Sequence, residues 1–304
     1  DGTDTRWPPR STHRRWSCDQ ESLRIMAEPN RLHAVLPREK DAIGIVGGFP
    51  IRLQQTATQV QGLPRGPRVP MPLVSQISEG MGCIRIAGGA PGRNGMLALL
   101  DPKTLVTSDV EVVGTDCLTG FAELSDIQVA VNAKGVLFSR RRGGTWTEQP
   151  AHQGACTGIV NVDNRTFVTF GVDGLIHIWD YMCKKLGTLE GHSTGITSGI
   201  LSTDGNLTTV STDRSVRIWD PVRQRQRMFL KGFDNALVAV HGVRETTVVL
   251  DTSGQVFTIA ETGKPRKMGT PSGYPCCSWI ARGEPASVYI AQRGGMIHRI
   301  PIGV

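Results

Sequence analysis

A turn recurs along this chain at intervals close to forty residues, and this spacing limits the available folds more than any other feature. The two clearest copies are residues 173–180 (DGLIHIWD) and 213–220 (DRSVRIWD). A constant period of this length indicates a repeat protein in which each unit is one supersecondary element. The second residue of the turn recurs six times, at steps of 40, 39, 40, 40 and 41, at Gly95, Gly135, Gly174, Arg214, Gly254 and Gly295.

Each unit is predicted to form short strands joined by tight turns. In the fifth unit, residues 196–202 and 206–211 alternate between apolar and polar, and 216–219 and 223–230 continue as third and fourth strands. Glycine suits the turns because tight hairpins need positive φ angles. Four strands in about forty residues are typical of a β-propeller blade.

The fifth unit also contains Gly191-His192 and Trp219-Asp220, and this pattern resembles the WD-repeat family. The resemblance implies a hydrogen-bonded tetrad of His, Ser/Thr, Asp and Trp in each matching blade. In two units the His-to-Asp and Asp-to-Trp spacings are identical, at 21 and 6 residues. The implied tetrads are His152, Thr169, Asp173 and Trp179 in the fourth unit, and His192, Thr209, Asp213 and Trp219 in the fifth.

Such a tetrad is chemically sensible, because a buried carboxylate needs partners and a buried indole N–H needs an acceptor. The sixth unit departs from the pattern, with Phe233, Val249 and Ile259 at the His, Thr and Trp positions. Its strands are expected to form without a tetrad.

Ring closure is predicted from a missing strand. The last unit has strands near 276–282, 287–293 and 296–302, and its fourth strand is absent. We expect residues 22–28 to supply it, since an open sheet edge exposes unpaired backbone groups. The predicted fold is therefore all-β, one closed propeller of seven four-stranded blades over residues 21–304. It has an irregular first unit near 31–72, five regular units and the closing unit. Residues 1–20, basic and with two tryptophans, are expected to form a flexible tail.

Composition excludes several classes of protein. No apolar run approaches 18 residues and no secretory leader opens the chain, so no membrane association is expected. The first residue is Asp1, which leaves open an excised domain or a processed mature form. The seven cysteines are scattered and form no metal-binding box, so we expect free thiols, no metal and no cofactor. A reducing intracellular compartment follows, either the cytoplasm or an organellar matrix.

Enzyme motifs are absent, including the phosphate-binding loop, the zinc-protease helix and the nucleophile elbow. His192, Asp213 and Ser211 suggest a hydrolase triad, but the repeat explains the His and Asp as structural. His177 and His298 occupy equivalent strand positions, where packing is the expected role. No catalytic residue is predicted.

Basic residues gather where the third strand of a unit meets the fourth. These turns lie on one rim of a propeller, so the net charge of +7 is expected to form an arc over blades three to six. Such an arc suits phosphate groups or an acidic protein surface, and a solvated protective edge is the alternative. The arc contains Arg140, Arg141, Arg142, Lys184, Lys185, Arg223, Arg225, Arg227, Lys264, Arg266 and Lys267.

The function predicted first is a non-catalytic scaffold that binds other proteins within a multi-subunit assembly. A ribonucleoprotein component holding RNA on the basic rim is the alternative, although no cluster of stacking aromatics supports it. A peptide reader in the central channel is a third candidate, and an enzyme the last. No small-molecule substrate is expected.

Overall fold

The computed structural model describes residues 22–24, 32–38, 41–46, 48–55, 60–62, 66–80, 83–243, 245–260, 263–269, 275–281, 286–292 and 296–302. The predicted tail 1–20 and part of the predicted closing strand, residues 25–28, lie outside these ranges. Strands and turns make up the described residues, and none of them belongs to a helix that could span a membrane.

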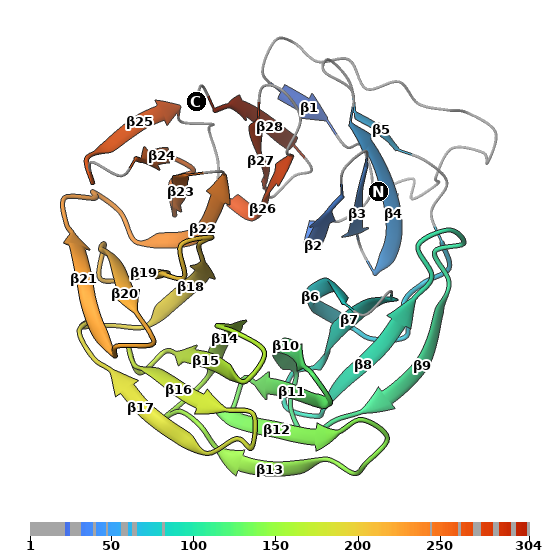
Figure 1. The fold of residues 1–304 in the computed structure, drawn as a ribbon. Coiled ribbons are helices and arrows are strands. Elements are labelled where there is room, and N and C mark those ends of the chain that lie inside the picture. Colours follow the sequence, from blue (N-terminus) through green and yellow to red (C-terminus); the bar gives the residue numbers. More distant parts are fainter. Residues whose placement is uncertain are drawn as a thin grey trace.

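The strands form seven antiparallel sheets of four strands, arranged as a ring (Figure 1). The predicted all-β propeller of seven blades is therefore confirmed. The first three blades contain β2 (Leu32–Pro37), β3 (Asp41–Val46), β4 (Phe49–Gln55) and β5 (Val60–Gly62); β6 (Leu73–Gly80), β7 (Cys83–Ala90), β8 (Asn94–Leu100) and β9 (Thr107–Val112); and β10 (Leu118–Leu124), β11 (Ile127–Asn132), β12 (Val136–Arg141) and β13 (Thr147–Pro150).

The remaining blades repeat this meander, in which each strand pairs with the next along the chain, except that β28 of the last blade pairs with β1. They contain β14 (Cys156–Asn161), β15 (Thr166–Gly171), β16 (Ile176–Asp180) and β17 (Lys185–Leu189); β18 (Ile196–Leu201), β19 (Leu207–Ser211), β20 (Val216–Asp220) and β21 (Arg225–Leu230); β22 (Leu237–Val243), β23 (Thr246–Asp251), β24 (Val256–Ile259) and β25 (Pro265–Gly269); and β26 (Pro275–Ala281), β27 (Ser287–Gln292), β28 (Met296–Pro301) and β1 (Ser22–Arg24).

The ring closes through β1, the first strand of the chain, which completes the seventh blade. Ser22 pairs with His298 and Arg24 with Met296, in antiparallel register. Figure 1 shows β1 beside β28, at opposite ends of the colour scale. The prediction that an N-terminal strand closes the last blade is confirmed, because its pairing satisfies backbone groups on the outer edge of β28.

The hydrophobic core lies between adjacent blades. Val168 and Ile178 of the fourth blade pack in one cluster with Leu207 and Trp219 of the fifth. Comparable clusters join the other successive blades from the first to the seventh. Because both faces of a blade are covered by its neighbours, side chains on both sides of a strand are buried, as in β11, where all six residues are buried.

Candidate binding surface

The disc has two faces that differ in chemistry. In an antiparallel meander, the turns between first and second strands and between third and fourth strands lie at one end of the blade. The remaining turns lie at the other end. His152, between β13 and β14, and Asp173, between β15 and β16, therefore lie on one face. The basic turns between third and fourth strands lie on the opposite face, at its outer edge.

The fourth blade contains a buried chain of hydrogen bonds. His152 Nδ1 lies 3.0 Å from Asp173, its Nε2 lies 2.9 Å from Thr169 Oγ1, and Trp179 donates its indole N–H to Thr169 Oγ1 at 2.9 Å. Since the ionised carboxylate only accepts, His152 Nδ1 carries the proton and Thr169 donates to Nε2. The four side chains join two strands, one turn and the loop entering the blade.

The fifth blade repeats this geometry. His192 Nδ1 lies 2.9 Å from Asp213, Thr209 Oγ1 lies 2.9 Å from His192 Nε2, and Trp219 donates to Thr209 at 2.8 Å. Ser211 donates instead to the carbonyl of Gly195 at 2.8 Å. The hydroxyl of Ser211 thus serves the backbone of the loop that enters the blade, it forms no hydrogen bond to His192 among the described residues, and it is fully buried.

Burial controls the protonation of these networks. It lowers the pKa of His152 and His192, although their aspartate partners act in the opposite direction. Burial also acts to raise the pKa of Asp173 and Asp213, but hydrogen bonds outweigh it and hold both below the usual range. At neutral pH the pairs are neutral imidazole with ionised carboxylate, a structural state with no exposed nucleophile.

The sixth blade replaces this network with apolar packing. Phe233, Val249 and Ile259 are buried in one cluster, and Phe233 meets Phe257 edge-to-face at 5.0 Å between ring centroids. Three hydrogen-bonding partners are replaced at once, and Ser253 at the Asp position donates to Asp251 at 2.6 Å, so no donor or acceptor of the tetrad is left unpaired.

Three side chains of the fourth blade, His152, Asp173 and His177, lie close enough to share a metal ion. Both nitrogens of His152 are already used within the tetrad, and His177 Nδ1 lies 3.1 Å from Thr188 Oγ1. Metal binding would break the tetrad, so these residues do not make a good metal site.

The predicted basic residues are exposed, with one exception. The exposed ones lie at the outer edge of the face opposite the tetrads, apart from Lys267, whose Nζ lies 3.3 Å from Asp234 in the loop between β21 and β22, on the tetrad face. Lys184 and Lys185 have no carboxylate partner among the described residues. Two of the arginines pair with a carboxylate of their own turn, since Arg223 and Arg225 lie 3.1 and 3.8 Å from Asp220. The fourth strand of the fifth blade, predicted from residue 223, begins at Arg225, so Arg225 and Arg227 lie in β21 and Arg223 lies in the turn.

Arg140 is the exception, and its prediction as an exposed rim residue is corrected. Its two terminal nitrogens donate to Glu111 of the second blade at 2.7 and 2.9 Å, and its Nε donates to Gln128 at 2.7 Å. The guanidinium also lies over the Trp146 ring, 4.4 Å from its centroid. Arg140 thus joins two blades, and its guanidinium has no pair of N–H groups left to bind a partner.

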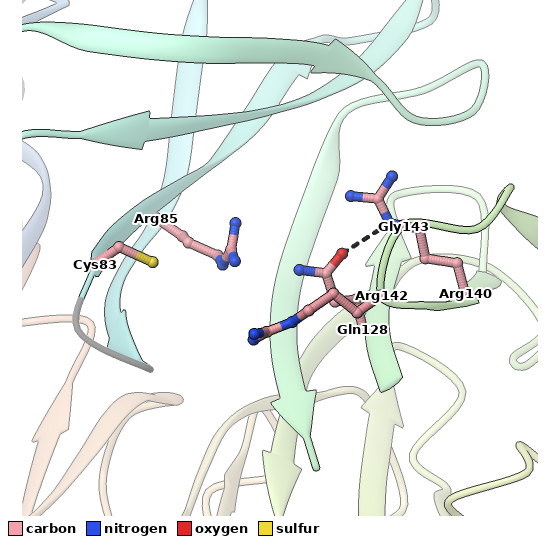
Figure 2. A pocket seen from close by; sticks show the side chains of 6 residues that line it. All are labelled: Cys83, Arg85, Gln128, Arg140, Arg142 and Gly143. Atoms are coloured by element: carbon pink, nitrogen blue, oxygen red, sulfur yellow. Dashed lines mark hydrogen bonds between the residues drawn. The ribbon is translucent and has the colours of Figure 1, made fainter. Parts of the chain in front are cut away.

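A cavity of about 320 Å³ opens beside Arg140, between the second and third blades. Figure 2 shows Arg85 and Arg142 extending into it from opposite sides, with Gln128 between them. Glu123 pairs with Arg85 at 2.7 Å and lies 4.0 Å from Arg142. With Glu111 held by Arg140, three arginines face two glutamates, so the cavity has only one excess positive charge. It is lined by Cys83, Arg85, Gln128, Arg140, Arg142 and Gly143.

The basic turns form a connected surface, because the outer strand of one blade contacts the turn of the next. Gln149 of β13 donates to the carbonyl of Cys183 at 2.7 Å. Gln224 fills the space where Gly187 of β17 lacks a Cβ, and Met228 of β21 lies near Gly263 in the same way. The exposed cations of blades three to six therefore follow one continuous edge. We call these cations, without Lys267, the basic arc: Arg141, Arg142, Lys184, Lys185, Arg223, Arg225, Arg227, Lys264 and Arg266.

Sequence reasoning missed the inter-blade network of Arg85, Glu111 and Glu123. A signal for Arg85 existed, since it is the one charged residue in the strand Cys83–Ala90. The stacking of His177 and the exposed apolar residues of the arc were also missed, because no local pattern marks either.

Five cysteines described with their side chains are thiols and not disulfides, as predicted: Cys83, Cys117, Cys156, Cys183 and Cys277. Burial raises the pKa of Cys156 to about 12, and burial also raises those of Cys117 and Cys183. These thiols are packing groups and not reactive nucleophiles. The reducing compartment stays a prediction.

Comparison with known proteins agrees with this geometry. Residues 183–220 match the family model described as "WD domain, G-beta repeat", which spans the outer strand of the fourth blade and the first three strands of the fifth. Among solved structures, the WD40 β-propeller domain of Doa1 is similar, with a TM-score of 0.74 at 9% identity over 95% of this chain and 97% of that one. A search of curated proteins found no match. The predicted resemblance to WD-repeat propellers is confirmed.

Proposed function

Given a seven-bladed propeller that contains a WD repeat, we propose that this chain is a non-catalytic scaffold that binds other proteins within a larger assembly. Propellers of this kind generally mediate protein–protein interactions. The closed ring supports the role because each blade is covered on both faces, so the surface is rigid and loses little entropy on binding.

The basic arc is the observation on which the proposal rests. It places nine exposed cations along one edge of one face, whereas the cavity has only one excess positive charge and the tetrads contain no cation at neutral pH. An exposed surface of one sign steers an oppositely charged partner and orients it. An acidic protein surface therefore fits the arc.

RNA is the competing ligand, because phosphates complement the same charge. The arc also exposes aliphatic side chains, including Met182 and Val222, at 57% and 74% of their surface. Aliphatic groups bind poorly to a phosphate backbone but pack well in protein interfaces. This observation favours a protein partner.

The test is affinity purification of the tagged chain with mass spectrometry, with and without nuclease. The arc variant is Lys184→Glu/Lys185→Glu/Arg225→Glu. The control, Arg93→Glu/Lys134→Glu/Arg214→Glu, reverses three charges in turns on the opposite face. We expect partners that survive nuclease, are retained by the control and are lost from the arc variant. Loss on nuclease treatment would instead identify RNA as the ligand, and full retention by the arc variant would overturn the arc as the binding surface.

A further inference from the structure

Large apolar side chains are exposed within the basic arc, on the fourth and fifth blades. They lie in the two turns between third and fourth strands and at the start of β17. In water such side chains are a net cost unless a partner covers them. Their exposed fractions are 40% for Tyr181, 57% for Met182, 46% for Leu186 and 74% for Val222.

The two turns are neighbours in space. The Gln224 side chain, from the turn of the fifth blade, occupies the position that a Cβ on Gly187 of β17 would fill. A larger residue at position 187 would have to displace this side chain. The apolar side chains of both turns can therefore meet one ligand together.

Both turns are rigid. Asp180 accepts the backbone N–H groups of Met182 and Lys184 at 2.9 and 2.8 Å, and Asp220 accepts that of Arg223 at 3.0 Å. Each turn also contains a non-glycine residue with positive φ, Cys183 at 58° and Gln224 at 52°. The exposed side chains are held in place before a partner arrives, which lowers the entropy cost of binding.

The charge around these apolar groups is strongly positive. Five cations, Lys184, Lys185, Arg223, Arg225 and Arg227, surround two carboxylates, Asp180 and Asp220. Both carboxylates already accept hydrogen bonds from backbone N–H groups of their turns, and Asp220 also binds Arg223 and Arg225. The surface therefore offers three net positive charges interleaved with apolar groups.

We propose that this surface, the turns of the fourth and fifth blades together with β17, binds an acidic segment of a partner protein in which apolar side chains alternate with carboxylates. The inference rests on the proposed scaffold function and names the chemistry of its partner. Charge complementarity favours carboxylates in the partner segment. Burial of the four exposed apolar side chains favours apolar side chains in the same segment.

The aromatic groups of this region do not suit stacking with bases. The Phe229 ring is covered by Arg217, 4.0 Å from its centroid, and by Lys231 at 4.9 Å. Of the four exposed apolar residues, only Tyr181 is aromatic. Single-stranded nucleic acid binds chiefly through several stacking platforms, so a peptide is the better ligand.

Fluorescence anisotropy with three labelled probes tests the inference. They are a short peptide of alternating Glu and Leu, the same peptide with Ser for every Leu, and a single-stranded oligouridylate. We expect the Glu–Leu peptide to bind at least about tenfold more tightly than the Glu–Ser peptide, since burying apolar side chains contributes this much or more. The oligouridylate is expected to bind more weakly than the Glu–Leu peptide.

Three variants locate the site. Met182→Ser/Val222→Ser and Lys185→Ser/Arg225→Ser should each weaken binding of the Glu–Leu peptide by about tenfold. The matched control, Val110→Ser/Val112→Ser, removes valines of similar exposure, 42% and 60%, from β9 of the second blade. It should change binding by less than about twofold. Unchanged circular dichroism and melting would show that the variants fold.

Three results would overturn the inference. The first is equal binding of the Glu–Leu and Glu–Ser peptides, the second is tighter binding of the oligouridylate that is unaffected by Met182→Ser/Val222→Ser, and the third is no binding of the Glu–Leu peptide. If the Glu–Leu peptide fails to bind while partners are still lost from the arc variant in the purification, this inference fails and the scaffold function stands. If the Glu–Leu peptide fails to bind and the purification also recovers no protein partner, the proposed function fails together with this inference.

Discussion

The imidazole of His177 stacks on that of His152 in the fourth blade, with 4.5 Å between the ring centroids and 27° between the planes. His177 pairs with Thr169 across the sheet, at the position that Arg217 occupies opposite Thr209 in the fifth blade. Burial lowers the pKa of His177 to about 4, and the charges of His152 and Lys185 act in the same direction. The two rings are stable together because both are neutral.

Acid is therefore expected to destabilise the propeller. Unfolded His177 binds a proton near pH 6.5, and the folded protein does so only near 4. The contribution of His177 to the free energy of unfolding is fully present above pH 6.5 and is lost as the pH drops toward 4. The free energy of unfolding falls by about 2 kcal/mol from this one group between pH 7 and 5. His241, also held near 4 by burial, adds to the same loss. Urea unfolding at several pH values measures it.

The matched variant for this prediction is His177→Gln, which keeps a polar group beside Thr188 and removes the titration. Its stability should fall less between pH 7 and 5 than that of the unaltered chain. An identical fall in both would show that His177 does not contribute.

The tetrad of the fifth blade makes a second prediction. Thr209 is fully buried, and its hydroxyl accepts from Trp219 and donates to His192. Thr209→Val keeps the shape but leaves both partners unsatisfied, which should cost roughly 2–4 kcal/mol. Thr209→Ser keeps the hydroxyl and should cost about 1 kcal/mol for the lost methyl. Equilibrium unfolding compares them, and a larger loss for serine would contradict the hydrogen-bond account.

The contact between the second and third blades makes a third. Arg140 holds Glu111 with two short hydrogen bonds, and the two side chains are 18% and 33% exposed. A double-mutant cycle of Arg140→Met and Glu111→Gln should give a coupling of about 1–2 kcal/mol. The exposed pair Lys267–Asp234, at 3.3 Å, serves as the control and should give less than about 0.5 kcal/mol. Equal couplings would show that the Arg140 pair is not special.

Turn geometry makes a fourth. Gly135 has φ of +79°, and a Cβ there would lie 2.2 Å from the carbonyl oxygen of Gly154. Gly135→Ala should cost about 3 kcal/mol or more, because backbone must move. Arg214 fills the corresponding turn position of the fifth blade with φ of 62°. Arg214→Gly removes the strain of a left-handed non-glycine residue and should change stability by less than about 1 kcal/mol. Thermal unfolding tests both, and equal losses would refute the account.

Much of the architecture could be predicted from the sequence because each blade is local. The turns at Gly135 and Arg214 join adjacent strands, so their period marks each blade directly. The missing fourth strand of the last blade predicted closure by a segment near residue 22, since a ring cannot leave that edge unpaired. The tetrad residues His192, Thr209 and Trp219 likewise all belong to one unit.

Contacts between blades could not be predicted in this way. Nothing within the third unit shows that Arg140 turns inward to Glu111, 29 residues away in the second blade, while Arg141 stays exposed. Likewise, only the packing of two blades brings Gln224 against Gly187 and joins Met182 and Val222 in one surface.

The sequence by itself thus determined the number of blades, the closing strand and the residues of the two tetrads, because these depend on hydrogen bonds within a unit or on completing one sheet. The tertiary structure decided which cations remain exposed and which apolar side chains accompany them. The physical reason is that exposure and pairing depend on side chains from neighbouring blades, and the repeat period contains no information about how one blade packs on the next.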